Sequence, residues 1–98
     1  MIRVVVQDEN GRDVSAAVDV ASRVLARPDD LRYGCLRFVD PYGDTIFNRA
    51  QLAPLLEDLR LLKNTVESRE HDAVLQQIET LIGQCQAEPH LYLKMIGD

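Results

Sequence analysis

The clearest local structural signal in the sequence is GCLRFVDPYGDTIFN, residues 34–48. Its centre, Asp40-Pro41-Tyr42-Gly43, has the composition of a tight turn. Aspartate accepts turn hydrogen bonds, proline presets a backbone dihedral angle, and glycine can adopt the left-handed region. The residues on either side of this turn, Gly34 to Asp40 and Thr45 to Phe47, read as two antiparallel strands. The sequence therefore predicts a hairpin with strands at residues 34–40 and 45–47.

The length of the turn fixes how these two strands pair. Phe38 is expected opposite Ile46, on the same face as Leu36, while Val39 is expected opposite Thr45. We expect helices to cover the face that carries Phe38 and the opposite face to be exposed.

A second hairpin is predicted at the start of the chain. Residues 2–7 read as a strand, and Asp8-Glu9-Asn10-Gly11 can form a type I turn with Gly11 in a left-handed bulge. Counting from this turn predicts the pairs Val6 with Val14, Val4 with Ala16, and Ile2 with Val18.

Residues 12–20 also allow a second interpretation. The apolar residues between Val14 and Leu25 recur at helical spacing, so these residues could form a helix instead of a strand. In the hairpin interpretation a short helix from Val20 to Ala26 follows, with Asp19 as a candidate cap.

A helix is predicted from Asn48 to about Asn64. Asn48 and Gln51 have the spacing of a capping box, and Phe47 can pack against Leu52. Pro54 removes one backbone donor, so we expect an irregularity there. The predicted apolar stripe is Leu52, Leu55, Leu56, Leu59, Leu62 and Val66.

A second long helix is predicted at residues 68–86, with Thr65 or Ser68 as its cap. Gly83 lies in its interior and weakens it, which suggests close packing against a neighbour. The apolar stripe of this helix is Val74, Leu75, Ile78, Leu81, Ile82 and Cys85.

Pro89 ends this helix and a final strand covers residues 90–96, either inside the sheet or at its edge. Leu91, Leu93 and Met95 should share one face, with His90, Tyr92 and Lys94 on the other. The expected fold is a single α+β domain over residues 1–98. It has a mainly antiparallel sheet of about five strands, with two longer antiparallel helices packed on one face.

Composition excludes several functional classes. The chain has 98 residues and a formal net charge of -5, without a basic cluster, so we expect no nucleic-acid partner. No apolar run approaches the roughly 20 residues that cross a bilayer, and no signal peptide is recognisable. We therefore expect a cytoplasmic protein that does not bind membranes. Cys35 and Cys85 are expected to be buried and unpaired.

The candidate chemical groups have ordinary structural explanations. The turn acids Asp8, Asp13, Asp40 and Asp44 could bind a hard cation, but turns favour aspartate in any case. His71 with Glu67, Glu70 and Asp72 could hold zinc, although neighbouring helical residues point in different directions. A Cys-His pair is disfavoured because buried thiols are poor nucleophiles. We predict no catalytic residue, metal or cofactor.

An exposed sheet face is the better candidate for function. In the predicted hairpin Arg37 and Phe47 face each other, and arginine and aromatic residues commonly anchor protein interfaces. Phe47 could instead only staple the helix. The candidate partner-binding residues are Arg37, Val39, Tyr42, Phe47, Tyr92 and Lys94.

Residues 36–48 and the ending LYLKMIGD, residues 91–98, resemble a group of small uncharacterised bacterial proteins that share this hairpin and C-terminus. The resemblance implies a stand-alone bacterial cytosolic protein, and it implies no activity, cofactor or site.

The function predicted from the sequence is a non-enzymatic protein-interaction module, such as an immunity-type or regulatory partner protein. Its partner would be another protein, including a second copy in a homodimer. The alternatives are a small-ligand or metal sensor that uses the turn acids and Tyr42, and a small hydrolase or transferase that uses Asp40, Asp44 or His90.

Overall fold

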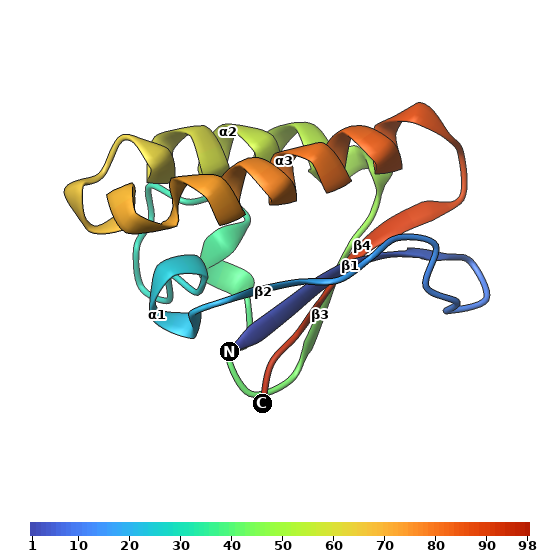
Figure 1. Cartoon of the computed structure of the whole chain (residues 1–98), viewed down its shortest axis with the longest axis horizontal. Helices are drawn as coiled ribbons and strands as arrows, with labels where there is room; N and C mark the ends of the chain where they lie inside the picture. Colours follow the sequence, from blue (N-terminus) through green and yellow to red (C-terminus); the bar gives the residue numbers. More distant parts are fainter.

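The chain forms one antiparallel sheet with two long helices across one of its faces (Figure 1). The computed structural model describes the backbone of residues 1–98 and all side chains except those of residues 66–68. The α+β class is confirmed, with four strands in the sheet instead of about five. In chain order the elements are β1 (Ile2–Asp8), β2 (Val18–Val20), α1 (Ser22–Leu25), the 3-10 helix η1 (Leu36–Phe38), β3 (Asp44–Phe47), α2 (Arg49–Lys63), the 3-10 helix η2 (Val66–His71), α3 (Asp72–Ala87) and β4 (Leu91–Ile96).

The last strand lies inside the sheet. The strand order is β2-β1-β4-β3, so β4 separates β1 from β3 and pairs antiparallel with both. Val4 pairs with Met95, which in turn pairs with Thr45. The two ends of the sequence thus form the centre of the sheet.

The first predicted turn is confirmed, and its predicted register holds only near the turn. Gly11 has φ 77° and donates to the Asp8 carbonyl at 3.0 Å, while the Val14 N–H donates to the Val6 carbonyl at 2.9 Å. Farther along, β1 pairs with residues two positions later than predicted, with Val4 opposite Val18 instead of Ala16. The Ser15 hydroxyl accepts the Val6 N–H at 3.0 Å, and this side-chain bond interrupts the regular ladder.

Residues 12–20 contain no α-helix, which excludes the helical interpretation. The following helix is shorter than predicted and covers only α1. Its N-cap is Ala21, without a side-chain cap bond, so the assignment of Asp19 as cap is wrong. Asp19 instead forms an ion pair with Arg3.

The predicted strand at residues 34–40 is wrong. Residues 36–38 form η1, whose side chains do not alternate between two sheet faces. The faces of β3 are consequently the reverse of the prediction. Phe47 is only 2% exposed and lies in the core, whereas Phe38 and Ile46 are 64% and 57% exposed.

The Asp40–Gly43 turn forms as predicted, but Gly43 is not left-handed. The Gly43 N–H donates to the Asp40 carbonyl at 3.5 Å, and the Asp40 carboxylate accepts the Tyr42 N–H at 2.9 Å. Among the described glycines Gly11 alone has a positive φ. Glycine suits position 43 because a Cβ atom there would lie 2.7 Å from the Asp40 carboxylate.

The capping box of α2 is confirmed. The Asn48 side chain accepts the Gln51 N–H at 3.2 Å, and the Gln51 side chain accepts the Asn48 N–H at 2.9 Å. The helix runs unbroken through Pro54, so the expected irregularity is absent from its described backbone. Ala50 and Pro54 are both exposed, so water can solvate the carbonyl that Pro54 leaves without an intrahelical donor.

The second long helix, α3, begins at Asp72 and not at residue 68. Its N-cap is His71, without a side-chain cap bond. A Cβ atom at Gly83 would meet nothing within 4 Å, so the expected close packing of this glycine is wrong. The predictions for the side chains of Val66, Glu67 and Ser68 fall outside the described side chains.

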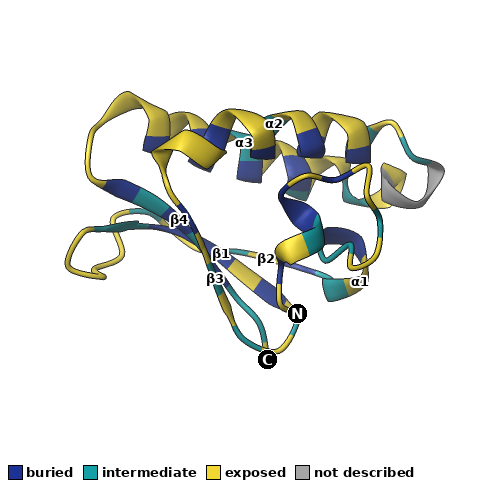
Figure 2. Ribbon diagram, turned by 180° about the vertical axis from the view of Figure 1, so that it is seen from behind, coloured by how far each residue is buried: buried dark blue, intermediate teal, exposed yellow. Residues whose placement is uncertain are grey.

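A single cluster of buried side chains lies between the sheet and the helices (Figure 2). The inward residues of β1, β3 and β4 meet the apolar stripes of α2 and α3. At the end of the sheet where it diverges from the helices, α1 and η1 fill the space between them (Figure 1). Within the described part of the chain, no helix has the length and apolarity to cross a membrane.

Candidate interaction surface

The face of the sheet turned away from α2 and α3 is here called the open face, since no helix packs on it (Figure 1). Successive side chains of a strand point to opposite faces of the sheet. A strand residue therefore lies on the open face when the residues before and after it point into the core. Its members are Arg3, Val5, Gln7, Asp19, Asp44, Ile46, Tyr92, Lys94 and Ile96.

The charged groups on the open face neutralise one another. The Arg3 Nε lies 3.1 Å from the Asp19 carboxylate, and the Lys94 Nζ lies 3.5 Å from the Asp44 carboxylate. The hydrogen bond to Asp19 also raises the pKa of the Arg3 guanidinium. The face is therefore formally neutral at these four residues, although the whole chain carries a net charge of -5.

The open face also carries apolar side chains, on both sides of Lys94. Val5 is only 1% exposed, although it points away from the main core, so the long side chains around it must cover it. Lys94 is its direct cross-strand neighbour, and Ile46 follows Lys94 on the next strand. Ile46 is 57% exposed. Tyr92 and Ile96 are partly exposed on either side of Lys94.

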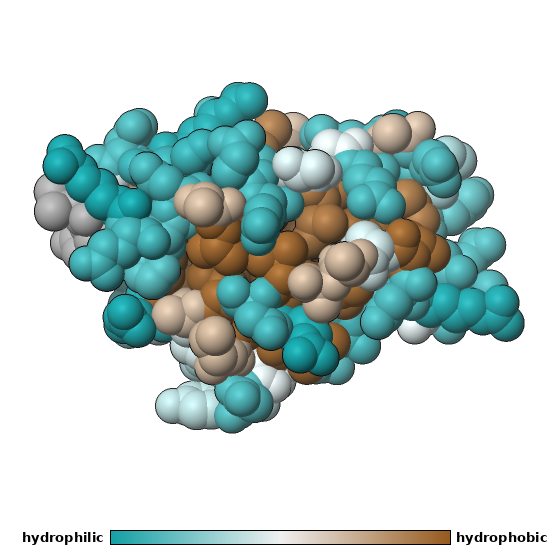
Figure 3. Space-filling view, viewed as in Figure 1, coloured by the Kyte–Doolittle hydropathy of each residue, from teal (hydrophilic) through white to brown (hydrophobic). Residues whose placement is uncertain are grey.

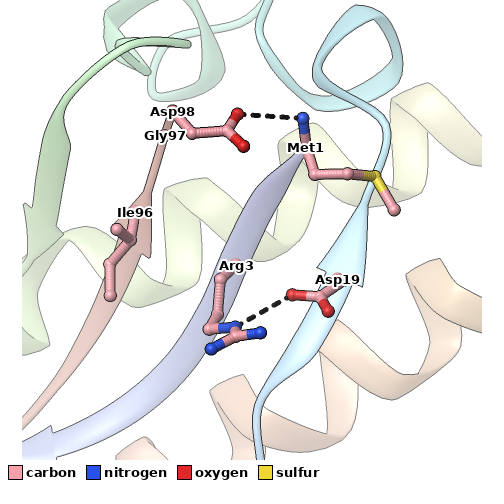
Figure 4. Close-up of a pocket in the computed structure, with 6 residues that line it drawn as sticks. All are labelled: Met1, Arg3, Asp19, Ile96, Gly97 and Asp98. Carbon is pink, nitrogen blue, oxygen red and sulfur yellow. Dashed lines mark hydrogen bonds and ion pairs between the residues drawn. The ribbon is translucent and has the colours of Figure 1, made fainter.

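Two shallow hollows lie at opposite ends of the open face. One of about 270 Å³ is drawn in Figure 4, where the Arg3 guanidinium points to Asp19 and the Met1 ammonium to Asp98. The other, of about 250 Å³, is lined partly by Ile46 and Tyr92. Both volumes fall below the roughly 300–1,000 Å³ of small-molecule sites, so the face is better suited to a protein surface.

Two of the six predicted partner-binding residues lie on the open face, namely Tyr92 and Lys94. Val39 and Phe47 do not, because they are 3% and 2% exposed in the core. Their expected positions at the surface are wrong, since β4 and not residues 34–40 pairs with β3. Phe47 and Leu52 belong to the same core cluster, which agrees with the alternative staple role.

The remaining two predicted residues lie in the segment before β3. Tyr42 projects from the turn and is 82% exposed. The Arg37 guanidinium stacks over the Phe38 ring, with its central carbon 4.6 Å from the ring centroid. Arg37 faces Phe38 and not the expected Phe47, because residues 36–38 are helical.

A second apolar surface runs between α3 and the free edge of β2 and is visible as a brown band in Figure 3. A groove of about 430 Å³ lies there. Leu81, at 7% exposed, belongs to its lining. The rest of the lining is Ser15, Ala16, Ala17, Val18, Gln77, Thr80 and Gln84.

Asp58 is a structurally important residue that the sequence reading missed. It is 6% exposed on α2 and accepts three successive backbone N–H groups. Its carboxylate lies 3.3 Å from the Gly34 nitrogen, 2.7 Å from that of Cys35 and 2.9 Å from that of Leu36. The sequence contained a signal for this role, because Asp58 lies on the apolar face of its helix and a buried carboxylate requires hydrogen-bond donors.

The turn acids have structural partners. The Asp8 carboxylate accepts the N–H groups of Asn10 and Arg12 at 2.9 and 3.0 Å, and Asp13 accepts from the Gln7 side chain at 2.7 Å. Among the described residues, no group of three or more His, Cys, Asp or Glu side chains could hold a metal ion.

Both cysteines are free and buried, as predicted. Burial raises the pKa of the Cys85 thiol to about 11, and burial together with Asp58 raises that of Cys35. These two thiols are therefore poorly suited to nucleophilic chemistry at neutral pH.

His90 is at the surface, where its Nδ1 lies 3.7 Å from a carboxylate oxygen of Glu9.

Comparison of the chain with protein-family models, with curated proteins and with solved structures gives no match.

Proposed function

We propose that this chain is a non-enzymatic protein-interaction module whose open face binds another protein. The observation that carries the proposal is Ile46, a large apolar side chain that is 57% exposed where the edge strand β3 borders the open face. An exposed apolar side chain bordered by polar and charged side chains is a usual feature of a protein interface.

The charges around Ile46 also suit a protein partner. The pairs Arg3–Asp19 and Lys94–Asp44 leave the face neutral, so binding would not bring together unpaired charges at its centre. Tyr92 and Lys94 add amphipathic side chains beside Ile46, and tyrosine is enriched in protein interfaces. A cytoplasmic location belongs to the same proposal and is supported by the two buried cysteines without a disulfide.

The test compares proteins captured from a host lysate by the wild-type chain and by two variants. Ile46→Glu places a charge on the β3 side of the open face, whereas Leu31→Glu introduces the same charge at a loop residue that is 79% exposed. We expect Ile46→Glu to abolish capture of the partner and Leu31→Glu to retain it. Equal capture by the wild type and Ile46→Glu would refute the open face as the binding surface.

A further inference from the structure

The outer edge of β3 offers unpaired backbone groups. β3 is the last strand in the order β2-β1-β4-β3, so one of its sides has no neighbouring strand. The Gly97 N–H donates to the Gly43 carbonyl at 2.8 Å, which identifies residues 43 and 97 as a hydrogen-bonded pair of the antiparallel ladder. Such pairs alternate, so residues 45 and 47 also bond to β4.

The same alternation directs the N–H and C=O groups of Asp44 and Ile46 away from β4. No turn, loop or side-chain hydrogen bond of the described residues reaches these four groups. A strand edge of this kind is a template for pairing with a further strand.

The opposite edge of the sheet is less suitable. β2 has only three residues, and the segment before it departs from regular strand geometry at Ser15. The Gln84 side chain also donates to the Val14 carbonyl at 3.3 Å, within this irregular segment. The free edge that can extend the sheet is therefore that of β3.

We propose that a second copy of this chain pairs antiparallel along β3 and joins the two sheets into one. Asp44 of each copy would lie opposite Ile46 of the other, about a two-fold axis that passes between the two Thr45 residues. This register pairs all four free groups of each copy and forms four hydrogen bonds, two donated by each copy. Both open faces then lie on the same side of the joined sheet.

The charges at the joint favour a second copy. Pairing brings the two Asp44 carboxylates onto one face as diagonal neighbours, roughly 7–8 Å apart, where bare carboxylates would repel each other. Each Asp44 already has the Lys94 ammonium of its own copy at 3.5 Å, so the joint is neutral. A neutral joint adds no local repulsion to that between two whole chains, each of which carries a net charge of -5.

The wild-type chain provides a test that needs no substitution. Sedimentation velocity should show a mass that rises with concentration towards twice 11.1 kDa. Between about 10 μM and about 1 mM, a range that covers weak interfaces, hydrogen exchange at the Ile46 amide should slow by about tenfold or more. A monomer over this whole range, or an Ile46 amide whose exchange does not change with concentration, would overturn the proposal.

Two substitutions of Ile46 distinguish backbone pairing along the edge of β3 from side-chain contacts of the open face. Ile46→Pro removes an N–H that is not used within the sheet, so the monomer should fold, as circular dichroism can verify. It removes two of the four joining bonds and should weaken dimerisation by at least about tenfold. Ile46→Thr keeps the N–H and should dimerise within about threefold of the wild type.

A dimer of folded Ile46→Pro as strong as that of the wild type would place the contact elsewhere and reject this pairing. The proposal is independent of partner binding by the open face. A chain that dimerises through β3 but captures no other protein would disprove the proposed function alone.

Discussion

Removing the Asp58 carboxylate should destabilise the fold strongly. Asp58 connects α2 to the start of η1 by accepting the N–H groups of Gly34, Cys35 and Leu36. In Asp58→Ala the N–H groups of Cys35 and Leu36 would be left in a buried environment without an acceptor. These two N–H groups make the shorter hydrogen bonds to Asp58, at 2.7 and 2.9 Å.

The magnitude follows from these two donors. Each buried N–H left unsatisfied costs roughly 1–3 kcal/mol. The better helix propensity of alanine returns about 0.5 kcal/mol. We expect a net loss of about 3 kcal/mol in the free energy of unfolding. For a chain of this size that corresponds to a fall of about 12–24 °C in Tm.

Asp58→Asn should cost less, because its amide oxygen can still accept from Cys35 and Leu36. The lost interaction would be the longest one, at 3.3 Å to Gly34, together with the negative charge. We expect a loss of about 1–2 kcal/mol. The control is Glu57→Ala, whose side chain is 72% exposed beside Arg60 and which should change stability by less than about 0.5 kcal/mol.

Urea unfolding followed by circular dichroism measures all three variants. The predicted order of stability is Glu57→Ala, then Asp58→Asn, then Asp58→Ala, with unchanged denaturant dependence. An Asp58→Ala variant as stable as Glu57→Ala, or an asparagine variant that loses as much stability as the alanine variant, would contradict this role of Asp58.

Three further predictions concern glycines and a thiol. Gly97→Ala should destabilise by about 1–3 kcal/mol, because its Cβ would lie 2.4 Å from the Pro41 backbone, and urea unfolding that showed no loss would contradict this packing. Gly83→Ala should instead stabilise by about 0.5–1 kcal/mol in the same assay, since its Cβ meets nothing within 4 Å. Cys85 should resist iodoacetamide at pH 8 in the native state, because its pKa is raised to about 11; rapid native labelling would show that it is accessible.

Local signals predicted much of the fold correctly. The Gly11 turn, the Asn48–Gln51 capping box and the alternation of β4 each depend on residues close in sequence. Their geometry is set by a few dihedral angles and nearby hydrogen bonds, and the distant parts of the chain alter it little.

The errors arose where distant residues decide the structure. Asp58 binds the N–H groups of residues 34–36, and this removes them from the strand pairing that the local sequence indicated. β4 then occupies the place beside β3 that residues 34–40 were expected to fill. This exchange turns Phe47 inward and Ile46 outward.

The candidate surface was affected by the same error. Tyr92 and Lys94 were placed correctly because β4 alternates regularly and its apolar residues face the core. Ile46 was missed because its orientation depends on which strand pairs with β3. A pairing of residues 44–47 with 93–96 spans about half the chain, and local periodicity does not report it.

Ile46 faces outward on the open face, while Phe47 faces the core. The difference in unfolding free energy between Ile46→Ala and Phe47→Ala measures this arrangement. We predict a loss of about 3–5 kcal/mol for Phe47→Ala and of less than about 1 kcal/mol for Ile46→Ala. Equal losses, or a larger loss for Ile46→Ala, would contradict both the inside-outside assignment of β3 and the surface built on it.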